Sequence, residues 1–146
     1  TLGLIPDLTA EQNGLLRDAA EVLSLYANYG SSLISVITGR ASGFGYTAFA
    51  SGGVGYDYTL AWAAADISAL PAQSLAVLER GGELSKAKLN NSGKDKNPEF
   101  DKIVQDYADQ KTDAFFAARK GYIDDVIEPA LTRSYLAAAL AMVSRF

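Results

Sequence analysis

The sequence predicts an α/β fold, because short β-branched runs alternate with longer segments of helical periodicity. The run from Leu33 to Thr38 lies between Gly30 and Gly39, and its apolar, β-branched character predicts a buried strand. Upstream of Gly30, apolar residues recur every three or four positions, which predicts an amphipathic helix. Alternation of these two kinds of element is typical of α/β domains.

The first helix is expected to begin at Thr9-Ala10-Glu11-Gln12, which has the form of a capping box, and to extend to Gly30. After the strand, residues 39–55 are rich in glycine, which indicates close approach of the backbone to something else. The remaining expected elements are strands at 58–62 and 66–69, helices at 71–78, 100–107 and 115–120, an extended segment at 122–127 and a last helix at 130–143. Between them, the polar residues 80–97 predict an exposed excursion.

Length and charge indicate one acidic domain. The 146 residues, with a formal net charge of -4, can bury a single core. The 13 Lys and Arg residues are scattered, so nucleic acid is not expected as a partner. No apolar run approaches the roughly 18–20 residues of a membrane span. The chain starts at Thr1 without a leader, and we expect residues 1–146 to be a fragment of a longer chain.

The absence of both histidine and cysteine restricts the chemistry. It excludes disulfides, thiolate nucleophiles and the commonest zinc ligands, and no metal site is expected. Asp124 and Asp125 are adjacent, so in an extended segment they point to opposite faces, which favours a structural role over a catalytic dyad. Trp62 is expected in the core, Arg17 on an exposed helix face, and Arg133 in a structural role near the last helix.

The most informative segment is Ser42-Gly43-Phe44-Gly45-Tyr46, which follows the predicted strand. A glycine turn between a strand and a helix can direct successive backbone N–H groups at an oxygen that gains negative charge, and the helix dipole adds to the effect. Many glycine turns after strands have no chemical role, and this alternative stays open. The glycine spacing fits neither the dinucleotide motif nor the phosphate loop.

Four segments give the sequence a family resemblance. They are Gly3 to Pro6, Ala41 to Tyr46, Leu60 to Ile67 and, most specifically, Gly121-Tyr122-Ile123-Asp124-Asp125-Val126-Ile127-Glu128-Pro129. Together the chain resembles the C-terminal domain of the biotin-dependent acyl-CoA carboxyltransferases, which include propionyl-CoA and methylcrotonyl-CoA carboxylase β subunits and related decarboxylase subunits. It departs from the family pattern at Phe44, Ala63, Asp66 and Pro71.

The resemblance implies a crotonase-like α/β fold with a core of short strands and flanking helices, in which residues 1–146 form the biotin-side carboxyltransferase domain. It implies that the backbone amides of Phe44 and Gly45 form an oxyanion hole for biotin, with Gly43 and Tyr46 in the cofactor-binding site. The implied partners are the N-terminal carboxyltransferase domain across a dimer interface, a biotin carboxyl carrier protein and further copies of the chain. An acyl-CoA thioester would be the substrate, and the location would be cytoplasmic.

Several functional alternatives stay open at this stage. The carboxylase and decarboxylase directions are not separated by the sequence. A biotin-free acyl-CoA enzyme on the same fold would use the glycine turn to hold a thioester oxygen instead. A third possibility is an inactive binding or assembly fragment, because function resides in sites rather than in folds.

Overall fold

A three-stranded parallel sheet forms the centre of the computed structural model, which describes residues 7–70, 72, 74–81 and 98–143. Its strand order is β1-β3-β5, with β1 at Ile34–Ile37, β3 at Tyr58–Trp62 and β5 at Asp125–Ile127. β3 is the middle strand, paired along both edges, and its residues Thr59 to Ala61 are buried. These positions confirm the α/β prediction and three of the four segments predicted as strands or extended chain, although β5 begins later than residue 122.

A second, two-stranded parallel sheet joins β2 (Arg40–Ser42) to β4 (Asp66–Ser68). The sequence predicts β4 but not β2, which lies in the glycine-rich segment. Its three residues form a strand because β4 supplies the partner, in a register that places Ser42 opposite Ser68. At the first pair of this register, Arg40 Nε and Asp66 Oδ2 form an exposed ion pair at 3.0 Å.

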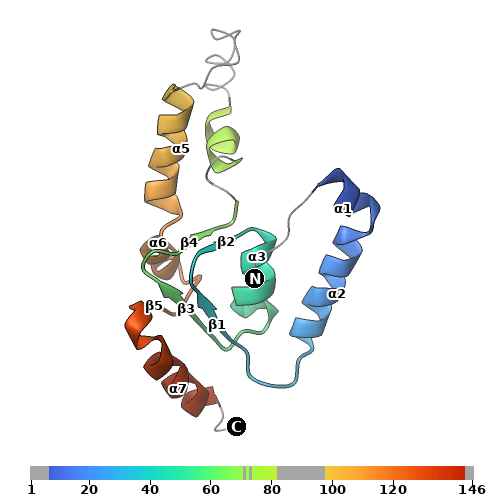
Figure 1. Ribbon diagram of the computed structural model, residues 1–146, viewed down its shortest axis with the longest axis vertical. Helices are drawn as coiled ribbons and strands as arrows, with labels where there is room; N and C mark the ends of the chain where they lie inside the picture. Colours follow the sequence, from blue (N-terminus) through green and yellow to red (C-terminus); the bar gives the residue numbers. More distant parts are fainter. Residues whose placement is uncertain (1–6, 71, 73, 82–97, 144–146) are drawn as a thin grey trace.

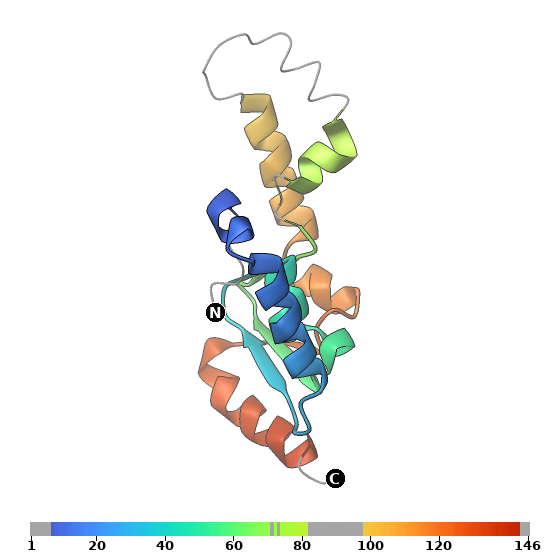
Figure 2. The same cartoon turned by 90° about the vertical axis from the view of Figure 1, so that its right-hand side faces the viewer.

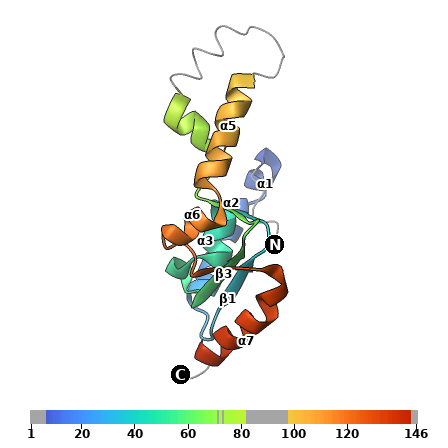
Figure 3. The same ribbon diagram turned by 90° about the vertical axis from the view of Figure 1, so that its left-hand side faces the viewer.

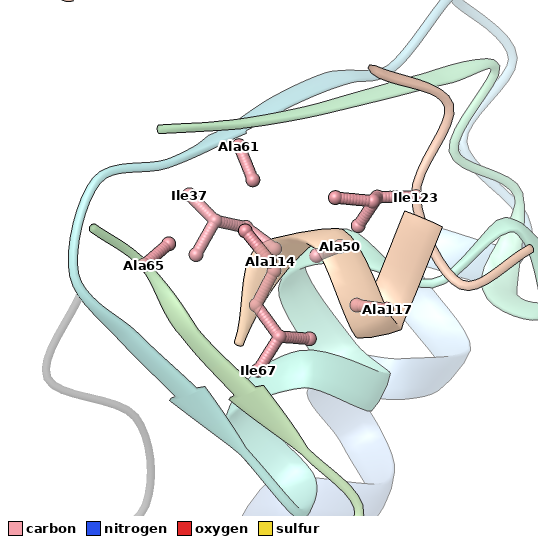
Figure 4. Packing of buried hydrophobic residues seen from close by; sticks show 8 residues of the cluster. All are labelled: Ile37, Ala50, Ala61, Ala65, Ile67, Ala114, Ala117 and Ile123. Carbon is pink, nitrogen blue, oxygen red and sulfur yellow. The ribbon is translucent and has the colours of Figure 1, made fainter. Parts of the chain in front are cut away.

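Helices cover both faces of the central sheet. α3 (Phe44–Ala50) and α6 (Ala114–Arg119) lie on one side and α7 (Thr132–Val143) lies on the other (Figures 2 and 3). The buried cluster between the sheets, α3 and α6 consists of Ile37, Ala50, Ala61, Ala65, Ile67, Ala114, Ala117 and Ile123 (Figure 4). Alanine dominates this core, and its small side chain lets the helices approach the strands closely.

The N-terminal helix begins differently from the sequence expectation. α1 spans Leu8–Gln12 and is capped by Asp7, whose Oδ1 accepts a hydrogen bond from the Ala10 N–H at 2.7 Å. The expected capping box at Thr9 is therefore wrong, because Thr9 already lies inside the helix. An aspartate is as good an N-cap as a threonine, and the aspartate precedes it.

The helix expected to reach Gly30 is also interrupted. Gly14 has φ 93°, a left-handed conformation that ends α1, and α2 then spans Leu15–Ala27. Only Ala19 of α2 is buried, whereas Leu16 and Leu25 are 66% and 65% exposed. α1 and α2 stand to one side of α3 (Figure 1). The apolar face predicted for this N-terminal helix is therefore only partly covered by the rest of the chain.

Two helices project from the sheets as an arm (Figure 1). One comprises residues 74–81, within and beyond the predicted helix at 71–78, and the other is α5 (Pro98–Lys111). Lys111 Nζ donates to both carboxylate oxygens of Glu79, at 2.9 and 2.7 Å, and the Tyr107 hydroxyl donates to Glu79 at 2.6 Å. Of the expected excursion at 80–97, residues 80 and 81 are helical and 82–97 lie outside the described residues.

The last helix is joined to β5 by a short 3-10 turn, η2 (Pro129–Leu131). α7 therefore starts two residues later than predicted. Its first residue, Thr132, accepts a hydrogen bond from the Trp62 Nε1 at 2.9 Å, which ties the start of α7 to the end of β3. Among the described residues, no helix is both long and apolar enough to cross a membrane.

Candidate active site

The glycine turn predicted from the sequence connects β2 to α3. Gly43 has φ 54° and ψ -125°, a conformation open to glycine and strained for other residues. Its N–H donates to the Ser68 carbonyl at 3.0 Å, and its carbonyl accepts from the Thr47 N–H at 3.0 Å and from the Thr47 hydroxyl at 3.1 Å. The turn is thus anchored on both sides, to β4 and to α3.

The first turn of α3 presents three backbone donors. The amides of Phe44, Gly45 and Tyr46 precede Thr47, whose N–H makes the first bond of the helix, and within the described residues none of the three has a hydrogen-bond partner. Free N–H groups at a helix start carry partial positive charge. They can bind a carbonyl oxygen or an oxyanion, which is the arrangement expected from the sequence.

A cleft of about 740 Å³ lies beside this turn, between α2, α3 and the first two strands. Gly45 lines it, and so does Ser42, whereas Phe44 does not. At the other end, Tyr26 packs edge-on against Phe49 with ring centroids 5.8 Å apart. Of the two predicted oxyanion donors, Gly45 is therefore the one at the cleft wall.

The cleft runs along the outer edge of β1. The Leu33 carbonyl accepts from the Asp57 N–H at 2.8 Å, so Leu33 faces β3. Because successive residues of a strand direct their N–H and C=O to opposite sides, those of Ile34 and Val36 point away from β3. Both residues line the cleft, which therefore has backbone donors and acceptors along its floor.

Tyr46, predicted to bind cofactor, has its side chain elsewhere. Its hydroxyl donates to the Tyr122 carbonyl at 2.6 Å, and the two rings are 6.2 Å apart. Burial, the largest cause, raises the pKa of the Tyr46 phenol above its usual value. The ring packs against the core cluster and joins α3 to the segment before β5, which leaves the Tyr46 amide as its group at the turn.

Asp124 has the structural role expected from the sequence. Its Oδ2 accepts from the Thr59 N–H at 2.7 Å, and its own N–H donates to the Thr59 carbonyl at 2.9 Å. Asp125 instead accepts from the adjacent Val126 N–H at 2.8 Å. The two carboxylates thus have separate backbone partners, and only that of Asp124 ties the start of β5 to β3.

Arg17 occupies the position predicted for it, exposed and paired with Asp18 at 3.2 Å. Trp62, predicted in the core, is only half-buried, because it is the last residue of β3 and its indole N–H donates to the Thr132 hydroxyl at the start of α7. Arg133 is exposed on the first turn of α7. In the described part of the chain, no group of three or more acidic residues could hold a metal ion.

Sequence reasoning missed one polar residue beside the turn. Ser68 is only 6% exposed, and its carbonyl holds the Gly43 N–H. A serine between Ile67 and Ala69 in a buried strand is an unusual place for a hydroxyl, and this was the available signal.

Comparison with known proteins supplies the family. The model of the carboxyl transferase domain matches residues 1–145. The propionyl-CoA carboxylase beta chain of Saccharopolyspora erythraea is 34% identical over 142 residues, which is 97% of this chain and 26% of that protein. The biotin-dependent acetyl-/propionyl-coenzyme A carboxylase beta5 subunit of Mycobacterium tuberculosis is 33% identical over 143 residues, 98% of this chain and 26% of that protein.

A solved structure of the same family has a similar fold. The crystal structure of transcarboxylase 12S, described as a hexamer assembly, superposes with a TM-score of 0.81 at 28% identity, over 97% of this chain and 26% of that one. This confirms the predicted crotonase-like fold. The chain spans about a quarter of the length of the curated relatives it matches. Because the family model covers nearly all of it, the chain belongs to the carboxyl transferase domain family.

Proposed function

We propose that the chain provides the biotin side of a carboxyl transfer site, at which a carboxyl group moves between carboxybiotin and an acyl-CoA. The observation that carries the proposal is the start of α3, where the Phe44 and Gly45 amides have no hydrogen-bond partner within the described residues. Anchoring of Gly43 to β4 and to Thr47 holds these donors in place before any ligand arrives. Donors fixed in advance stabilise a developing oxyanion without a cost of reorganisation.

The donor set fits the ureido group of biotin. The Phe44 and Gly45 N–H groups would hold its carbonyl oxygen and would favour negative charge on it, because they lie at a helix start. When bound, biotin supplies the nitrogen that carries the carboxyl group and takes the α-proton of the acyl-CoA in exchange. The chain needs no histidine or cysteine for this, because its residues position and polarise the ligand.

The acyl-CoA side of the site is proposed to come from another domain. The matched relatives are about four times as long as this chain, which leaves ample length for an N-terminal carboxyltransferase domain. In this proposal, residues 1–146 belong to the C-terminal domain, the two domains meet at a dimer interface, and a biotin carboxyl carrier protein delivers the cofactor. The chain alone would then be inactive, and the complete enzyme would be a cytoplasmic homo-oligomer.

Biotin-dependent decarboxylation of malonyl-CoA and methylmalonyl-CoA tests the proposal. Two proteins are compared, this chain alone and the longer polypeptide that contains it. Turnover only in the longer protein, and only with biotin, is the expected result. Turnover without biotin would instead favour a biotin-free acyl-CoA enzyme, and turnover in neither protein would favour a binding or assembly fragment.

Substitution of Gly45 tests the backbone donor. Gly45→Pro removes the amide hydrogen at the second residue of α3, where no intrahelical hydrogen bond is lost. Loss of one oxyanion donor lowers kcat by about 100- to 1000-fold. Gly45→Ala retains the N–H and is the matched control for adding a side chain at the cleft wall, so its kcat is expected to stay well above that of Gly45→Pro. Equal activity of the two variants, both folded by thermal unfolding, would contradict the role of this amide.

A further inference from the structure

β1 is an edge strand whose outer side lacks a partner. Within the described residues β1 pairs only with β3, and the outward N–H and C=O groups of Ile34 and Val36 make no hydrogen bond. The apolar, β-branched sequence of β1 is typical of a strand that is covered on all sides, yet Ile37 alone is buried and the other three residues are half-buried. The described residues therefore do not supply the cover that this sequence predicts.

The two edges of the central sheet differ in their protection. Proteins commonly place charged side chains or proline on a sheet edge that must not pair with another strand. β5, at the opposite edge, contains Asp125 and is followed by Glu128 and Pro129. β1, with the sequence Ile-Ser-Val-Ile, contains neither a charge nor a proline. The edge of β1 thus has the character of an edge that is paired.

The cleft beside β1 gives a further strand room to pair. Every residue from Ile34 to Ser42 lines it, so the strand edge itself forms the floor. Tyr26, Phe49 and Tyr56 also line the cleft, with Tyr26 in ring contact with both of the others. An extended segment on this floor would bond the free backbone groups of β1 and bury apolar side chains against the three rings.

Such a strand would leave the glycine turn open. Tyr56 lies two residues before Tyr58, the register partner of Ile34, which places the three rings at the start of β1. Gly45 follows the end of β2 and lies at the opposite end of the cleft. Pairing along the four residues of β1 takes about 13 Å of extended chain, at about 3.3 Å per residue. The added strand and the proposed carboxyl transfer site would therefore occupy different ends of one cleft.

We propose that the outer edge of β1 pairs with an extended apolar segment that the longer polypeptide supplies from outside residues 1–146. The matched relatives are about four times as long as this chain, so length for such a segment is available. β1 of a second copy fits the edge less well. Because Tyr26 of α2 lines the cleft, two such edges brought together would set one α2 against the other, an obstacle that a single extended segment does not meet.

Hydrogen exchange at single amides of the longer polypeptide, without biotin, tests this proposal. The amides of Ser35 and Ile37 face β3 and serve as the internal reference. The amides of Ile34 and Val36 are expected to exchange as slowly as the reference amides, within about tenfold, because both edges of β1 are then paired. Exchange at Ile34 and Val36 faster than this would leave the edge unpaired and overturn the proposal.

Two further conditions identify what covers the edge. Protection of Ile34 and Val36 that is lost on dilution would assign the edge to another molecule, and protection that appears only after biotin is added would assign it to the ligand. Either result overturns the proposal, whereas protection that is independent of both supports it. The inference does not rest on the proposed function. If these amides are protected and the decarboxylation assay shows no biotin dependence, the proposed function fails and the strand pairing stands.

Discussion

Gly43→Ala perturbs the residue on which the geometry of the candidate site depends most directly. At φ 54° and ψ -125°, an L-amino acid is strained by about 1–3 kcal/mol. The new Cβ would meet only the Ala69 carbonyl oxygen, at 3.5 Å, an ordinary contact, so the cost is conformational and not a clash. Alanine also restricts the unfolded chain, which returns about 0.4–1 kcal/mol. The net loss of stability is therefore about 0.5–2 kcal/mol.

For a chain of this size, the loss corresponds to a Tm lower by about 1–8 °C in thermal unfolding. The effect on activity should be larger, because relief of the strain rotates the peptides that follow. A misplacement of about 1 Å in a positioned group can cost on the order of 100-fold in rate. In the biotin-dependent decarboxylation assay, we therefore expect a loss of kcat well beyond the loss of stability.

Gly30→Ala is the matched control. Gly30 is exposed, lacks a left-handed φ, and has no atom within 4 Å of the position of a new Cβ. Alanine there should leave Tm unchanged or raise it slightly through the unfolded state. If Gly43→Ala matched Gly30→Ala in both Tm and kcat, the turn would not need a glycine, and the argument for pre-positioned amides would be refuted.

Three further predictions concern the surrounding structure. Asp124→Ala should lower stability by about 1–3 kcal/mol in urea unfolding, because the Thr59 N–H loses its acceptor, whereas Asp124→Asn, which keeps an acceptor oxygen, should lose less. Tyr46→Phe removes one hydroxyl bond to the backbone before β5 and should cost about 0.5–1.5 kcal/mol, and no loss would contradict that contact. The hydrogen bond from Lys111 lowers the pKa of Glu79, so the stability that Glu79 contributes is present above its unfolded pKa and is lost as pH falls through its folded pKa. The same bond raises the pKa of Lys111, so the stability that Lys111 contributes is lost as pH rises through its folded pKa. Glu79→Gln should reduce the dependence of Tm on pH at both the acid and the alkaline end, and an unaltered profile would argue against the Glu79–Lys111 pair.

The elements found from the sequence are those whose signal is local. β3 has the bounds predicted for it, and β1 and β4 lie within their predicted ranges, because a buried strand needs a short apolar or β-branched run between breakers. The glycine turn was located in the same way, from its position after a strand. The two errors at the N-terminus, the cap and the unbroken helix, are also local. Asp7 and Thr9 are both acceptable caps, and apolar periodicity does not reveal a single left-handed glycine such as Gly14.

The candidate site was found only in part, because its members differ in what determines them. The Gly45 amide could be predicted, since a backbone donor depends on the turn alone. Side-chain directions could not, and for Tyr46 the contact with Tyr122 is 76 residues away in sequence. The Ser68 hydroxyl, which has no hydrogen-bond partner within the described residues, depends equally on what surrounds it.

By itself, the sequence determined the α/β class, most of the strand and helix segments, the glycine turn and, through its family resemblance, the expected chemistry. Tertiary structure alone decided the pairing β1-β3-β5, the separate pair of β2 with β4, and the cleft along the outer edge of β1. The physical reason is that periodicity and turn chemistry act over a few residues, whereas strand pairing depends on groups far apart in the chain. Asp124 bonded to Thr59 across 65 residues is such a case, and no local pattern encodes it.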